Sequence, residues 1–169
     1  MKMKGQTIIE VVVALGAGAI VLTAMTVIIL TSLKNSQQSS SQSLATQYAQ
    51  QGMDIARQMK DNNWTAFNSL NGNYCVASSC SEISLQGTTC GPKGASCSAN
   101  IDNKFVREVT ISAGSTSCRP QNYNPSTTYS KITTIVSWRD PQCTSVSNPY
   151  CHNVSLQSCV SNYNKRPAP

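Results

Sequence analysis

The stretch KGQTIIEVVVALGAGAIVL (residues 4–22) places one carboxylate, Glu10, at the entrance of a long apolar segment. The twenty positions of residues 11–30 carry no charge. An α-helix of that length spans about 30 Å, the thickness of the hydrocarbon core of a bilayer. Nothing else in the chain is apolar enough to surround such a helix in water. We therefore expect residues 6–33 to form a transmembrane helix that contacts membrane lipid.

The charges around this segment predict its orientation. Lys2 and Lys4 precede it, and Glu10 adds only one negative charge. The positive-inside rule then keeps the N-terminus in the cytoplasm and exports the rest of the chain. The segment is also longer than the apolar core of an ordinary secretory signal, for which about 7–15 residues suffice. We predict a single-pass protein of the cytoplasmic (inner) membrane with its C-terminal part outside the cytoplasm.

The motif formed by Gly5, Gln6 and Glu10 is specific. A short basic leader ends in glycine, and a glutamate stands five positions later at the head of an aliphatic helix. This arrangement resembles the type IV prepilin leader. The resemblance implies a leader peptide of residues 1–5, cleavage between Gly5 and Gln6 by prepilin peptidase, and N-methylation of Gln6. Many members of the family carry phenylalanine at the first mature position, where this chain has Gln6.

A partner for Glu10 is needed on physical grounds, because a lone charge in hydrocarbon costs about 3 kcal/mol. Cleavage would create an α-amino group with a pKa of about 8. The resemblance implies that Glu10 pairs with the Gln6 amine of a neighbouring subunit during assembly. An N-terminal glutamine can cyclise and lose that amine, and we hypothesise that N-methylation slows this reaction.

Residues 34–63 are predicted to continue the helix. The stretch NSQQSSSQS could be a flexible linker. Against this alternative, there is no proline or glycine in residues 31–51. Apolar residues then recur with helical spacing at Leu44, Tyr48, Ile55 and Met59. We predict one helix over residues 7–60, weakened around residues 35–43, that packs one face on the domain that follows.

Residues 64–169 are predicted to form an extracytoplasmic, disulfide-rich head. Trp64 and Leu70 are expected to pack back onto the helix, and residues 71–103 read as loop. Dense β-branched residues predict strands at 104–113, 129–138 and 152–160. The expected fold is α+β, with a long N-terminal helix packed on a small antiparallel sheet. The last two strands also resemble those of minor pilins of the type IV pilus modification kind.

The cysteines all follow the apolar segment, on the side predicted to be exported. Such cysteines indicate disulfides, here formed by Cys75, Cys80, Cys90, Cys97, Cys118, Cys143, Cys151 and Cys159. Eight cysteines allow 105 connectivities. We predict that the three close pairs bond locally, as 75–80, 90–97 and 143–151, and that Cys118 bonds Cys159.

Catalytic, cofactor and metal sites are not expected. The chain has no C-x2-C pair, and its one histidine, His152, is expected at a strand edge. No motif places two carboxylates or a Cys–His pair for catalysis, so an enzyme is not predicted. The net charge is +6, but the basic residues are scattered and not interleaved with aromatics. Nucleic acid is therefore a weakly supported partner.

Two functions remain from the sequence. The first is a structural subunit, a minor pilin or pseudopilin, in a type IV pilus-like filament. Its partners would be other pilin or pseudopilin subunits, the prepilin peptidase/N-methyltransferase and the inner-membrane assembly platform, and its destination an extracellular pilus or a cell-envelope pseudopilus. The second is a membrane-anchored, extracytoplasmic binding module, an adhesin or a DNA- or glycan-binding head, that does not polymerise.

Overall fold

The computed structural model describes residues 6–84, 90–94, 97, 101–120, 127–141, 143–144 and 149–162, with side chains from Ile8 onwards. The predicted leader, including Gly5, lies outside these residues. The chain divides into two compact units, Met1–Ser41 and Gln42–Pro169. We call the second one the head unit. It contains the C-terminal part of the first helix and everything after it.

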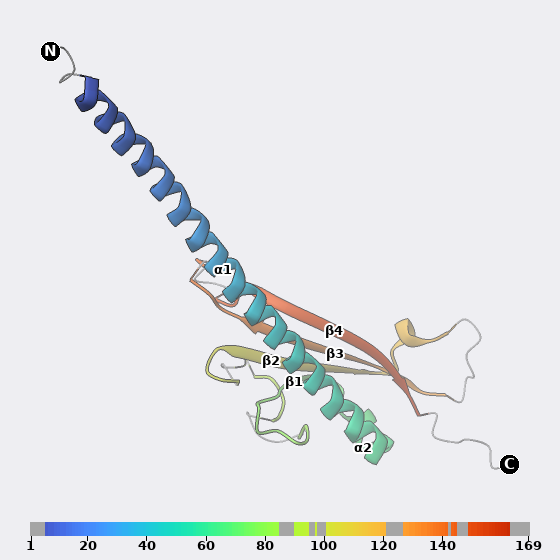
Figure 1. The fold of residues 1–169 in the computed structure, drawn as a ribbon. Coiled ribbons are helices and arrows are strands. Elements are labelled where there is room, and N and C mark those ends of the chain that lie inside the picture. The colour runs from blue at the N-terminus through green and yellow to red at the C-terminus, as the bar shows by residue number, and fades with distance from the viewer. Residues whose placement is uncertain are drawn as a thin grey trace. The chain divides into compact units, whose positions relative to one another are not determined.

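Helix α1 runs from Gln6 to Asn62 (Figure 1). The predicted helix over residues 7–60 is confirmed. The backbone stays helical through residues 35–43, so the predicted weakening and the flexible-linker alternative are wrong. Lys60 stands in its last turn, where a positive charge is favourable at the helix C-terminus.

The head unit contains a four-stranded antiparallel sheet in the order β1-β2-β3-β4 (Figure 1). Its strands are β1 (Gly72–Cys75), β2 (Phe105–Ala113), β3 (Tyr129–Trp138) and β4 (His152–Ser161). The three predicted strands are confirmed. Strand β1 was missed because its four residues lie in a Gly-, Ser- and Cys-rich segment. Two short helices, α2 (Trp64–Ser69) and η1 (Thr116–Cys118), complete the described elements.

One face of the sheet packs on the C-terminal part of α1. Small helix residues, Ala45 and Ala49, pack in one cluster with Phe105, Val136 and Trp138. Further along, Met53 and Ala56 pack with Phe67, Leu70, Val109, Ile111 and Ile132. Trp64 is partly buried against this second cluster, so its predicted packing role is confirmed, as is that of Leu70.

The face of α1 that packs on the sheet includes three of the four predicted residues, because Tyr48, Ile55 and Met59 pack against the core clusters and Leu44 does not. Leu44 is 37% exposed, and Tyr48, Ile55 and Met59 are only partly buried. The fully buried positions are Ala45, Ala49 and Ala56, all completely covered. Small side chains let the helix backbone lie close to the sheet, and the larger apolar residues then flank the contact.

Gly52 marks the closest approach of α1 to the sheet. A Cβ at this position would lie 2.9 Å from both Arg107 Cδ and Thr134 Cγ2. Neither atom moves easily, because Arg107 is held by hydrogen bonds at its head and Thr134 is β-branched. The glycine that weakens the helical pattern in the sequence is therefore required by the packing.

Gly52→Ala is expected to destabilise the head unit. Overpacking costs about 1–3 kcal/mol, and two contacts at 2.9 Å place this site at about 2–3 kcal/mol. The better helix propensity of alanine returns about 1 kcal/mol, so we expect a net loss of about 1–2 kcal/mol. Urea denaturation of the full chain in detergent measures it. Gly18→Ala is the matched control, since no atom lies within 4 Å of that position. A Gly52→Ala protein as stable as the wild type would contradict the close contact.

Four disulfides join all eight cysteines. The predicted pairs 143–151 and 118–159 are confirmed. The predicted local pairs 75–80 and 90–97 are wrong, because the bonds run Cys75–Cys97 and Cys80–Cys90. The physical reason is that residues 91–93 run alongside β1: the amide of Cys75 donates to Gly91 O at 2.9 Å, and that of Lys93 to Asn73 O at 2.7 Å. Cys75 and Cys80, in and after β1, therefore bond cysteines of the segment that runs alongside β1, not each other.

Removing the Cys118–Cys159 bond should cost more than removing Cys143–Cys151. These bonds span 41 and 8 residues, and the loop-entropy relation gives the longer one about 1.5 kcal/mol more stabilisation. We expect that difference between the two double Cys→Ser variants in their free energies of unfolding. Equal losses would mean that native-state packing, and not loop closure, determines the contribution of each bond.

Candidate functional site

The N-terminal part of α1 is an exposed apolar surface. Every large apolar side chain from Ile8 to Leu33 is more than half exposed, from 53% at Val21 to 71% at Ile20. This helix is long and apolar enough to cross a membrane. An exposed surface of this kind is far larger than a water-soluble monomer tolerates, so it indicates membrane anchoring.

The threonine hydroxyls inside this apolar segment are satisfied within the helix itself. Thr26 Oγ1 donates to Leu22 O at 2.9 Å, and Thr31 Oγ1 donates to Val27 O at 2.8 Å. Thr23 Oγ1 bonds the carbonyls of Ala19 and Ile20 in the same way. Gly16 and Gly18 leave the surface open, with no atom near the missing Cβ. The segment can therefore enter lipid or pack closely against another helix.

Glu10 is the one acidic residue of this segment, and it is exposed. It lies on the first part of α1, one helical turn after Gln6, where the helix begins. Residues one turn apart share a helix face. Glu10 lies just beyond the first turn of α1, which contains no acidic residue. Gly5, the other residue of the predicted cleavage site, is outside the described residues.

Arg107 joins three parts of the head unit, and sequence reasoning missed it. It lies on β2 and is 1% exposed. Its Nε donates to Val76 O at 2.9 Å, and its NH2 group donates to Ala77 O at 2.7 Å. Its NH1 group donates to Tyr48 O on α1 at 3.1 Å. A single buried guanidinium thus ties helix, sheet and the loop after β1 together.

Two pKa shifts accompany this junction. Burial lowers the pKa of Arg107 to about 10, so the guanidinium stays charged at neutral pH. The hydrogen bond from Tyr48 Oη to Asp102 Oδ2, 2.6 Å long, raises the pKa of the Tyr48 phenol. Both Asp102 and Asn103 have left-handed backbone conformations, with φ of 50° and 52°, in the turn that leads into β2. These contacts are structural and touch no candidate ligand.

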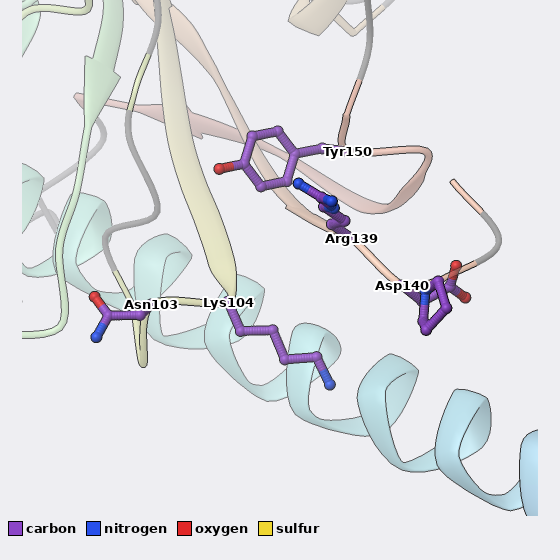
Figure 2. Close-up of a pocket in the computed structure, with 6 residues that line it drawn as sticks. Asn103, Lys104, Arg139, Asp140 and Tyr150 are labelled. Atoms are coloured by element: carbon purple, nitrogen blue, oxygen red, sulfur yellow. The ribbon is translucent and has the colours of Figure 1, made fainter. Parts of the chain in front are cut away.

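An open hollow of about 540 Å³ lies at the start of β2 and the end of β3 (Figure 2). Figure 2 shows Tyr150 and Arg139 drawn next to one another, with Lys104 on the segment that leads into β2. Asn103, Asp140 and Pro141 complete the lining. Lys104 and Arg139 are exposed, and Lys104 Nζ lies 5.4 Å from the centroid of the Phe105 ring. The hollow offers two cations and a phenol to a polar or anionic ligand.

The described elements form an α+β, pilin-like layout: a long apolar N-terminal helix whose C-terminal part packs on a disulfide-bonded, four-stranded antiparallel sheet. Disulfides at this density indicate an oxidising, extracytoplasmic location for the head unit. Compared with known proteins, the chain matches no family model, no curated protein and no solved structure.

Proposed function

We propose that this chain is a structural subunit of a type IV pilus-like filament, a minor pilin or pseudopilin. The leader would be cut between Gly5 and Gln6, the Gln6 amine methylated, and residues 6–33 used to assemble the filament. In this proposal the chain is the substrate of the prepilin peptidase and has no catalytic activity of its own. Its other partners are neighbouring subunits and the inner-membrane assembly platform, and nucleic acid is not required.

The observation that carries the proposal is the position of Glu10. It stands at the head of an uncharged segment, residues 11–30, whose large apolar side chains are all exposed, in a chain with a disulfide-bonded head unit. A plain membrane anchor gains nothing from a carboxylate there, since the charge costs about 3 kcal/mol in hydrocarbon. A filament subunit gains an ion pair, because the Glu10 carboxylate would be paired once the Gln6 amine of a neighbouring subunit lies beside it.

The proposal also gives a location. The chain begins as a single-pass inner-membrane protein with its head unit outside the cytoplasm, in agreement with Lys2 and Lys4 before the helix. It then moves into an extracellular pilus or a cell-envelope pseudopilus. In the filament, the exposed apolar side chains of residues 8–33 would pack against those of neighbouring subunits, with Gly16 and Gly18 allowing close approach.

The N-terminus of the full chain tests the proposal directly. We would measure intact mass and N-terminal sequence of protein from membranes, with and without a prepilin peptidase. We expect a chain that starts at Gln6, with added methyl groups, only when the peptidase is present. Gly5→Leu is the matched variant and should stay uncut. An uncut Met1 with active peptidase, or a cut beyond Leu30, would refute the proposal.

The hollow beside β2 favours a second function, a membrane-anchored binding module that does not polymerise. Lys104, Arg139 and Tyr150 would then hold a polar or anionic ligand, a surface glycan or DNA, while α1 acts only as an anchor. This alternative needs no cleavage after Gly5 and no role for Glu10. The N-terminal measurement therefore separates the two functions.

A further inference from the structure

Four potential metal ligands meet where β3 ends and β4 begins. Asp140 and Cys143 follow β3, and Cys151 and His152 lead into β4. Their ligand atoms all lie within 4.8 Å of one another. The sequence does not reveal this group, because residues 140 and 152 are brought together only by the pairing of Trp138 with His152 at the end of the β3–β4 ladder.

The contacts within this group are polar and short. His152 Nε2 lies 2.8 Å from Asp140 Oδ2, and Cys143 Sγ lies 3.6 Å from Asp140 Oδ1. The backbone N–H of Asp140 donates to Cys143 Sγ at 3.4 Å. The His152 ring stacks on Trp138, with 5.4 Å between ring centroids. His152 is thus held in the last pair of the ladder, and the N–H···S bond is of the kind that favours a thiolate.

We propose that reduction of the Cys143–Cys151 disulfide converts this group into a Zn²⁺ site with Asp140, Cys143, Cys151 and His152 as its four ligands. The same residues would then be cross-linked in one of two ways, by a disulfide under oxidising conditions or by a zinc ion under reducing ones. A dithiol supplies the two electrons and two protons that break the S–S bond, and is itself oxidised to a disulfide. Zn²⁺ binding then releases the two thiol protons.

The geometry fits zinc with small movements. Zinc takes sulfur at about 2.3 Å and nitrogen or oxygen at about 2.0–2.2 Å in a tetrahedron, so its ligand atoms lie about 3.2–3.8 Å apart. The 2.8 Å contact between Asp140 and His152 must open by a few tenths of an ångström, and the sulfurs must separate once their bond is broken. The side chains of Asp140 and His152 are each 23% exposed, so the group is accessible to an ion from solvent.

The test uses the full chain in detergent. After mild reduction with a dithiol, alkylation mapping identifies which pairs have opened, and the dithiol is then removed. Zn²⁺ affinity is measured by competition with a chromophoric chelator, and Co²⁺ reports tetrahedral thiolate coordination through its visible absorption. We expect one Zn²⁺ per chain in the reduced protein and none at this site in the oxidised one. Asp140→Asn and His152→Gln should each weaken binding about 10-fold or more.

Two double variants make the result specific to this loop. Reduced Cys143→Ser/Cys151→Ser should lose the site, whereas reduced Cys118→Ser/Cys159→Ser should keep it. Oxidised Asp140→Asn and His152→Gln proteins should melt as wild type does, which shows that they fold. Equal Zn²⁺ binding by the two reduced double variants, or unchanged binding in His152→Gln, would overturn the proposal. So would a reduced wild type, with 143 and 151 shown to be open, that binds no Zn²⁺.

Discussion

Glu10→Val should remove this chain from filaments while leaving its amount in the membrane unchanged. The variant helix is more apolar, so it enters the bilayer at least as well as the wild type. What it loses is the pairing of Glu10 with the amine of a neighbouring Gln6. Each 1.4 kcal/mol of lost assembly free energy lowers incorporation about tenfold, so loss of a charge pair in hydrocarbon should reduce it at least that much.

The measurement is the ratio of this chain in sheared filaments to that in membranes. Glu10→Gln keeps the size of the side chain and removes its charge, and it should behave like Glu10→Val if the charge is what matters. Val27→Ile, a change on the same exposed apolar surface, is the neutral control. If Glu10→Val entered filaments at the wild-type ratio, the pairing account would be wrong, although the chain would still be a filament subunit. Absence of the wild-type chain from sheared filaments would instead favour the membrane-anchored binding module.

Arg107→Met should give the largest loss of stability in the head unit, about 4 kcal/mol. Methionine fills a similar volume but cannot donate a hydrogen bond. It would leave Val76 O, Ala77 O and Tyr48 O without the guanidinium that now donates to them. Each buried acceptor left unsatisfied costs about 1–3 kcal/mol, and this sum exceeds the gain from removing a buried charge. A loss of this size is a large part of the stability of a small domain.

Urea denaturation of the full chain, followed by tryptophan fluorescence, measures this loss. Arg107→Lys is the matched variant, because it keeps the charge but replaces the planar fork with a single donating nitrogen. The free energy of unfolding of Arg107→Lys should lie between those of the wild type and Arg107→Met. A loss below about 1 kcal/mol in Arg107→Met would show that water replaces the guanidinium at little cost, and that the junction contributes little to folding.

Much of the fold could be predicted because the signals are local. Twenty uncharged residues define the helix that begins near Gln6, and β-branched residues define β2, β3 and β4 almost to the residue. The packing face of α1 could not be predicted in the same way. The sequence directs attention to large apolar residues such as Leu44, whereas close packing on a sheet selects Ala45, Ala49 and Gly52.

The candidate sites also differ in how far the sequence predicts them. The Gly5–Glu10 motif is contiguous, so the sequence contains all of it. Arg107 had a signal that could have been used: it alternates with Phe105 and Val109, which places a charge on the buried face of β2. The group around Asp140 had a partial signal, since the predicted Cys143–Cys151 bond also places His152 near Cys143. The approach of Asp140 to His152, twelve residues away, depends on the ladder of β3 and β4.

The disulfide pattern has a consequence for resistance to proteolysis. Cys80–Cys90 is nested inside Cys75–Cys97, and Cys143–Cys151 is nested inside Cys118–Cys159. A protease that cuts one peptide bond anywhere in residues 75–97 or 118–159 therefore leaves both fragments covalently attached. Between Cys75 and Cys159 only residues 98–117 are not bridged, and nine of these form β2, the strand held between β1 and β3. Within residues 75–97 and 118–159 the chain thus remains one molecule after a single cut.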